Sequence, residues 1–97
     1  MEGAAARREI SMKREPDFFD GHDPQLIYIA KRLDDALQLE DTLTRAGVDY
    51  GVEADKFTAG VIFRGERVGA FFYVLPKDLD AAIETLRAHG YKPARLN

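Results

Sequence analysis

Residues that could do chemistry are few in this sequence, and their spacing does not build a reactive site. The histidines are His22 and His89, Ser11 is the only serine, and there is no cysteine. Asp20, His22 and Asp23 lie close together in the stretch DGHD. A divalent cation, however, needs about four ligands on a fixed frame, and this stretch is more typical of an acidic loop. We therefore predict no catalytic residue, no metal site, no cofactor and no enzymatic activity.

Two arginines flank a predicted hairpin turn and are candidates for binding. Gly65-Glu66 can form a two-residue turn, because glycine at the first central position fits a type II′ geometry. This turn pairs Arg64 with Arg67, and the two guanidinium groups could hold a phosphate or a carboxylate. Glu66 between them favours local neutralisation at a solvated hairpin tip as the alternative.

Two segments with apolar residues at helical spacing must frame the predicted sheet. They are RLDDALQLEDTLTRAG (32–47) and PKDLDAAIETLRAHG (76–90). Asp34 or Asp35 can cap the first helix and Asp78 the second, and glycines stand where left-handed C-terminal caps belong. A shift of 43 residues superposes identical residues of the two segments: Asp35 on Asp78, Thr42 on Thr85, Leu43 on Leu86 and Gly47 on Gly90.

These matches indicate a duplicated β-α-β unit, with LIYIA (26–30) as the first strand. Two such units give an α+β, ferredoxin-like βαββαβ sandwich, with an antiparallel sheet and two helices on one face. We place this domain at residues 26–97. Residues 1–25 are rich in charge and poor in aliphatic side chains, and we predict a polar, flexible N-terminal tail there. Met12 is an alternative start of the protein.

The stretch ERVGAFFYVLP (66–76) raises a packing question, because it is apolar or glycine at every position from Val68 to Leu75. With the turn at Gly65-Glu66, the predicted helix-packed face holds Val61, Phe63, Val68, Ala70, Phe72 and Val74. The predicted opposite face holds Ile62, Arg64, Arg67, Gly69, Phe71 and Tyr73. The 43-residue shift adds Tyr28 beside Phe71, with Leu26 and Ala30 flanking it.

Exposure of these aromatic residues would be costly. Burying one apolar or aromatic side chain of this size is favourable by about 1.5–3 kcal/mol, against a total stability of about 5–10 kcal/mol for such a domain. A second copy of the chain, Phe18 and Phe19 of the tail, or a ligand or nucleic acid could cover the face, although tyrosine also tolerates half-exposure. We predict a homodimer or a protein partner, bound by Tyr28, Ile62, Arg64, Arg67, Phe71 and Tyr73.

Composition narrows the possible partners. The 97-residue chain is 45% hydrophobic and 32% charged, which is typical of one ordinary globular domain. Its net charge of −3 provides no basic field for nucleic acid or an anionic membrane. No apolar run is long enough for a signal peptide or a membrane span, so we expect a cytoplasmic protein.

The frame from Leu26 to Tyr91 resembles a group of small bacterial signal-transducing, PII-like domains of uncharacterised function. The residues that carry the resemblance are TRAGVDYGV (44–52) and YVLPKDLDAAIETL (73–86). The resemblance implies a ferredoxin-like fold and regulatory protein contacts, and it assigns no catalytic or binding residue.

A second resemblance is to the RNA-recognition module, which places aromatic residues on its first and third strands. IYIAKRL (27–33) and RVGAFFYV (67–74) are similar to the two strand motifs, but Val68, Gly69 and Val74 depart from the pattern. RNA or single-stranded DNA binding through the same face is thus a rival hypothesis, as is a small-molecule sensor.

Overall fold

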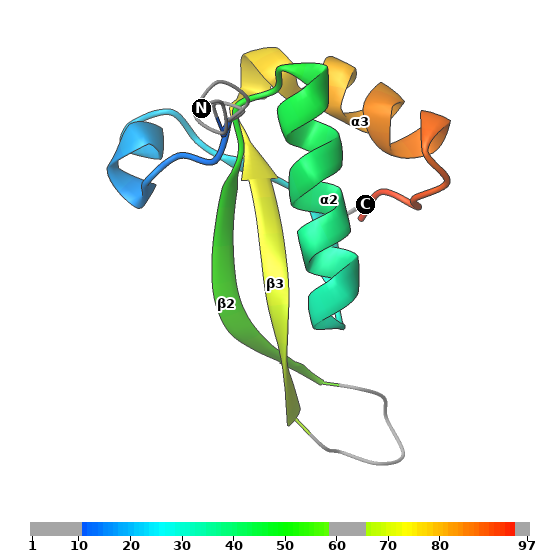
Figure 1. Ribbon diagram of the computed structural model, residues 1–97. Helices are drawn as coiled ribbons and strands as arrows, with labels where there is room; N and C mark the ends of the chain where they lie inside the picture. Colours follow the sequence, from blue (N-terminus) through cyan, green and yellow to red (C-terminus); the bar gives the residue numbers. More distant parts are fainter. Residues whose placement is uncertain (1–10, 59–65, 95–97) are drawn as a thin grey trace, which may run out of the picture.

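Antiparallel strand pairing organises the molecule. The computed structural model describes residues 11–58 and 66–94 and is α+β (Figure 1). Strands β1 (Gln25–Ala30), β2 (Gly51–Thr58) and β3 (Glu66–Val74) form one sheet in the order β1-β3-β2. Both pairings are antiparallel.

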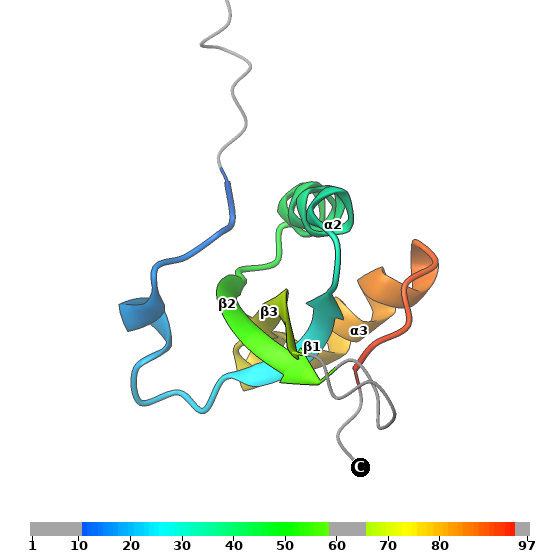
Figure 2. The same cartoon turned by 90° about the horizontal axis from the view of Figure 1, so that it is seen from below.

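Figure 2 shows helices α2 (Leu33–Ala46) and α3 (Leu79–Ala88) beside the sheet. Their apolar side chains are buried in one core with those of the sheet. A 3₁₀ turn, η2 (Pro76–Asp78), leads into α3. Phe72 and Val74 alternate with Phe71 and Tyr73 along β3, and only the first pair is fully buried. The face of β3 that packs on the helices was therefore predicted correctly for these residues. The fully buried side chains of the core are Tyr50, Phe72, Ile27, Leu39, Leu43, Leu86 and Val74.

The predicted C-terminal glycines of the helices are confirmed, but the predicted N-terminal cap of α2 is wrong. Gly47 and Gly90 have φ angles of 75° and 83°, the left-handed region that glycine adopts without a steric penalty. Arg32 occupies the N-cap position of α2 and makes no side-chain capping bond, which places Asp34 and Asp35 inside the first turn. There they complement the helix dipole instead of capping it.

The two halves of the predicted duplication are alike in their helices. Leu43 and Leu86 are both fully buried. The hydroxyl groups of Thr42 and Thr85 both donate to the carbonyl oxygen four residues earlier. The residues that the 43-residue shift superposes therefore share burial and hydrogen bonding in the two helices.

The predicted register of the hairpin is wrong. Val68 pairs with Lys56 and Ala70 with Ala54, and Glu66 lies opposite Thr58 instead of within a two-residue turn. The reason is the packing of Tyr50, whose ring stacks on Phe72 at 5.9 Å between centroids and aligns the start of β2 with the end of β3. Residues 61–64, predicted to form the second strand, lie outside the described residues.

One end of the hairpin extends past the rest of the fold. Strand β1 pairs only with residues 70–74 of β3, whereas residues 66–69 pair with β2 alone. We call residues 55–58 and 66–69 the hairpin arm; Figure 1 shows it projecting beyond α2. Val68 stands four residues before Phe72 on β3 and therefore on the same side of the sheet. It is nevertheless 65% exposed, because the helices end before they reach it. The prediction of Val68 as a core residue is wrong for this reason.

The described residues contain three strands, so the fourth strand of a βαββαβ arrangement is not present among them. After α3 the chain runs back along β1, where the backbone N–H of Ala94 donates to the carbonyl oxygen of Ile27 at 2.7 Å. Pro93 cannot donate a backbone hydrogen bond next to it, which disfavours a regular ladder.

Candidate functional site

The face of the sheet opposite Phe72 and Val74, here called the open face, is the candidate site. Residues that pair directly in an antiparallel sheet project from the same face. Phe71 pairs with Ile29 and Glu53, and Tyr73 pairs with Leu26. Leu26, Ile29, Phe71 and Tyr73 are partly exposed, and Glu53 and Asp55 on the neighbouring edge strand are exposed.

Tyr28 does not belong to this face, so its predicted position beside Phe71 is wrong. A β-bulge between Leu26 and Tyr28 shifts the register, and Tyr28 pairs with Phe72 on the helix side. One extra residue in a strand reverses the alternation of every side chain after it. Ala30, also predicted on the open face, is buried for the same reason.

The structure brings Phe71 and Tyr73 together on the open face, as predicted. Ile62 and Arg64 lie outside the described residues. Arg67 is placed in β3 opposite Phe57, but the structure describes only its backbone. The grouping of these three residues with Phe71 and Tyr73 stays a prediction.

Met12, Arg14 and Phe19, in the segment that the sequence assigned to the tail, lie against the start of β2. The backbone N–H of Arg14 donates to the carbonyl oxygen of Tyr50 at 2.8 Å, and the N–H of Tyr50 donates to the carbonyl of Met12 at 3.1 Å. The Arg14 guanidinium also pairs with Asp49, with 2.6 Å between Nε and Oδ1. This short parallel bridge ends as the chain enters the 3₁₀ turn η1 (Pro16–Phe19).

Phe19 covers one end of the open face. Its side chain is 8% exposed, and its ring lies directly on Gly51. A Cβ atom added at Gly51 would stand 2.5 Å from the nearest ring carbon, a distance that real contacts do not reach. Gly51 is therefore required for this contact. Of the covers considered from the sequence, the tail thus supplies one, through Phe19, at this end of the open face only.

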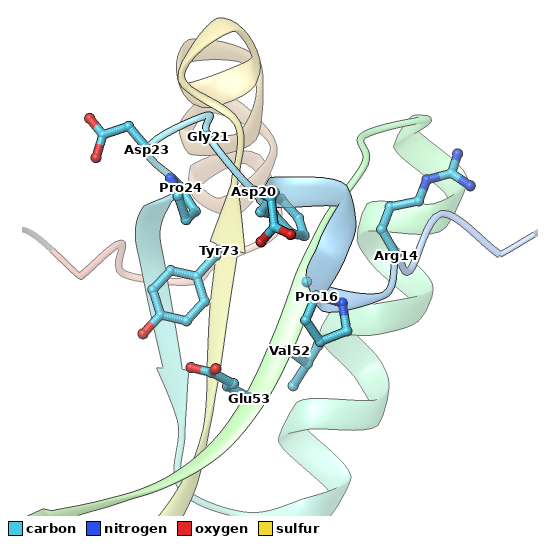
Figure 3. A pocket seen from close by; sticks show the side chains of 11 residues that line it. Arg14, Pro16, Asp20, Gly21, Asp23, Pro24, Val52, Glu53 and Tyr73 are labelled. Atoms are coloured by element: carbon cyan, nitrogen blue, oxygen red, sulfur yellow. The ribbon is translucent and has the colours of Figure 1, made fainter.

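A groove of about 530 Å³ lies between η1 and the sheet, beside the contact of Phe19 with Gly51 (Figure 3). Its walls are apolar where Phe19, Val52 and Tyr73 meet, and acidic at Asp20 and Glu53. Burial first, and then the carboxylates of Glu53 and Asp55, raise the pKa of Tyr73. We call this hollow the Phe19 groove; its lining is Arg14, Pro16, Phe19, Asp20, Gly21, Asp23, Pro24, Gly51, Val52, Glu53 and Tyr73.

The Phe19 groove was not predicted from the sequence. The adjacent pair Phe18 and Phe19 among acidic residues was a signal that the segment carries anchors. The small residue Gly51 in front of an alternating stretch, VEAD (52–55), was a signal for an edge strand that another group approaches closely. Nothing in the sequence shows that Phe19 is the group that approaches Gly51.

A second cavity, of about 480 Å³, lies on the helix side between β1, the start of α2 and the C-terminal segment. The Tyr28 hydroxyl donates to Oδ2 of Asp35 at 3.0 Å, and its ring packs edge-to-face on Tyr91 at 5.2 Å between centroids. Burial and this hydrogen bond raise the pKa of Tyr28 to about 12. Lys31, Arg32 and Lys92 line the same cavity.

The described residues offer little for other chemistry. No three histidine or acidic side chains among residues 11–58 and 66–94 are grouped as a metal site requires. His89 ends α3, with Nδ1 at 3.0 Å from the carbonyl oxygen of Thr85, so its ring is a helix-end group. In the same part of the chain, neither helix has the length and apolar character needed to cross a membrane.

No protein-family model, curated protein or solved structure matches this chain. The resemblance to the PII-like domains therefore rests on the residues quoted above.

Proposed function

We propose that this chain is a small non-enzymatic interaction domain that self-associates through the open face of its sheet. One observation carries the proposal: the face presents four partly exposed apolar or aromatic side chains, and η1 covers only the end at Gly51. A second copy offers the same surface, so a symmetric dimer can bury all of them at once. The four side chains are Leu26, Ile29, Phe71 and Tyr73.

The distribution of charge supports this arrangement. The apolar side chains stand on β1 and β3, whereas Glu53 and Asp55 stand on β2 at the edge of the sheet. A two-fold axis near β1 and β3 leaves both carboxylates at the rim of the interface. Charged residues are normally found at the rim, where they stay hydrated.

The same charges speak against the nucleic-acid alternative. An RNA-recognition surface needs an aromatic ring on the first strand, but Tyr28 faces the helices and donates to Asp35. Carboxylates at Glu53 and Asp55 would repel a phosphate backbone. These observations favour a protein partner.

The proposal includes the ferredoxin-like βαββαβ fold with its fourth strand. A ferredoxin-like sheet has its fourth strand beside β1, and the hydrogen bond from Ala94 to Ile27 lies at that edge. The observed order β1-β3-β2 is the order of the other three strands in that arrangement. A regulatory role, which the PII-like resemblance implies, and a cytoplasmic location are part of the same proposal.

Absolute molar mass in solution tests the proposal. By light scattering, the full chain is expected at twice its monomer mass of 10.9 kDa. Phe71→Glu should give monomers, because a carboxylate cannot be buried between two apolar faces. Val68→Glu is the matched control: it makes the same change in charge on the same strand, but at a position 65% exposed on the other side. A monomeric wild type, or equal dissociation of both variants, contradicts the proposal.

A further inference from the structure

We propose that the outer edge of β2, together with the Phe19 groove, binds an extended segment of a protein partner that carries lysine or arginine. The first observation concerns the backbone. The N–H and C=O groups of Tyr50 both point away from β3 and bond to Met12 and Arg14. The backbone N–H and C=O groups of Val52 and Ala54 therefore also point away from β3, because the direction of these groups alternates from one strand residue to the next.

Those outward groups have no backbone partner among the described residues. The N-terminal segment pairs with Tyr50 and then turns away into η1, so the edge stops being covered at Gly51. An unpaired strand edge is a template for one more strand. The bridge at Tyr50 shows that this edge accepts a strand from outside the sheet.

The second observation concerns the side chains next to this edge. Asp20 and Glu53 bring two carboxylates to the groove beside Tyr73 (Figure 3). Arg14 is the only cation of the lining; Figure 3 shows it pointing away from Tyr73, and it is held by Asp49 and by the Phe18 ring at 5.5 Å. A lysine or arginine side chain could lay its methylene stem on the Tyr73 ring and place its charge between the carboxylates.

The same charges disfavour a second copy as the occupant of this edge in the two registers centred on its outward and inward residues. Two β2 strands related by a two-fold axis at Ala54 would place Glu53 opposite Asp55 of the other copy, and an axis at Asp55 would pair the two Asp55 residues. Like charges directly opposite each other destabilise a strand pair. The edge thus favours a basic segment over a second copy. Tyr73 belongs both to the Phe19 groove and to the open face, so the segment and a second copy compete for its ring, and the inference does not require the dimer to form.

The test uses the full chain and a short acetylated peptide in which threonine and lysine alternate. Backbone amide signals of Val52 and Ala54 are expected to shift in NMR spectra on titration, and the peptide in which glutamate replaces lysine should cause no shift. Glu53→Lys should weaken binding at least about tenfold. Glu84→Lys is the matched control: it makes the same charge change at an exposed position of α3 and should leave binding unchanged.

A backbone variant separates strand addition from charge attraction alone. Ala54→Pro removes one outward N–H and leaves the bonds between β2 and β3, so it should abolish binding. The inference is overturned if the lysine peptide causes no shifts at the β2 edge, if Glu53→Lys and Glu84→Lys weaken binding equally, or if Ala54→Pro, with native spectra elsewhere, binds as the wild type does. The molar mass of Phe71→Glu has no bearing on these outcomes, so failure here is distinct from failure of the proposed dimer.

Discussion

At the scale of single residues, Gly51 and Phe19 form the most demanding contact of the molecule. The ring occupies the space where any other residue would hold its Cβ atom. Strand positions ordinarily disfavour glycine, since it packs nothing and loses more backbone entropy than other residues. Here this cost is offset by the burial of an aromatic ring on the backbone.

Gly51→Ala should therefore displace Phe19 and lower the free energy of unfolding by about 1–3 kcal/mol, the range found for overpacked sites. In a Phe19→Ala background the same substitution should cost nothing, because the obstructing ring is gone. Urea unfolding of the four proteins of this double-mutant cycle measures the coupling. Equal effects of Gly51→Ala in both backgrounds would show that the two residues do not act together.

At the scale of elements, the hairpin arm differs from the rest of β3. Residues 70–73 have a strand on each side, and Phe72 is covered by the helices. Residues 66–69 have a neighbour on one side only. Local opening is easier where few apolar contacts and few strand neighbours hold the backbone.

Amide hydrogen exchange should therefore be faster in the arm than in the central part of β3, by about tenfold or more. Amides that bond to β2 along residues 66–69 are compared with amides that bond to β2 along residues 70–73, so that the partner strand is the same. Uniform protection along the whole of β3 would contradict this expectation and indicate that the arm is held by contacts beyond β2.

The elements also show how far sequence reasoning reaches. Leu39, Leu43 and Leu86 revealed both helices, because the spacing of apolar residues is local information. The bulge at Ile27 and the start of β2 at Gly51 were missed, because each is determined by a partner distant in sequence. In the candidate site, Phe71 and Tyr73 were found from strand alternation, whereas the error at Tyr28 follows from the single unforeseen residue of the bulge.

At the scale of the whole molecule, Tyr28 connects three parts of the fold. It stands on β1, donates to Asp35 of α2 and packs against Tyr91 of the C-terminal segment. Its pKa is raised from 10.0 to about 12, first by burial and then by the hydrogen bond to Asp35. The folded chain therefore keeps the phenolic proton over a range of pH in which the unfolded chain has lost it.

Stability should accordingly fall as the pH rises from 10 toward 12, since the folded state binds more protons there than the unfolded state. Tyr28→Phe should be less stable than the wild type at neutral pH by about 1 kcal/mol, the usual value of one hydrogen bond. Its decline above pH 10 should be shallower, although Tyr50, Tyr73 and Tyr91 still contribute. Chemical unfolding at a series of pH values measures this, and parallel curves for the two proteins would contradict it.

The bridge between the N-terminal segment and β2 also has a consequence for the order of assembly. Arg14 and Asp49 are 35 positions apart, so the N-terminal segment leaves the ribosome well before the strand that receives it. A contact of such long range forms after local helix contacts. The Phe19 groove is therefore expected to form late in folding. It can also open first, because Met12, Arg14 and Phe19 can detach from β2 while α2, α3 and the sheet stay together.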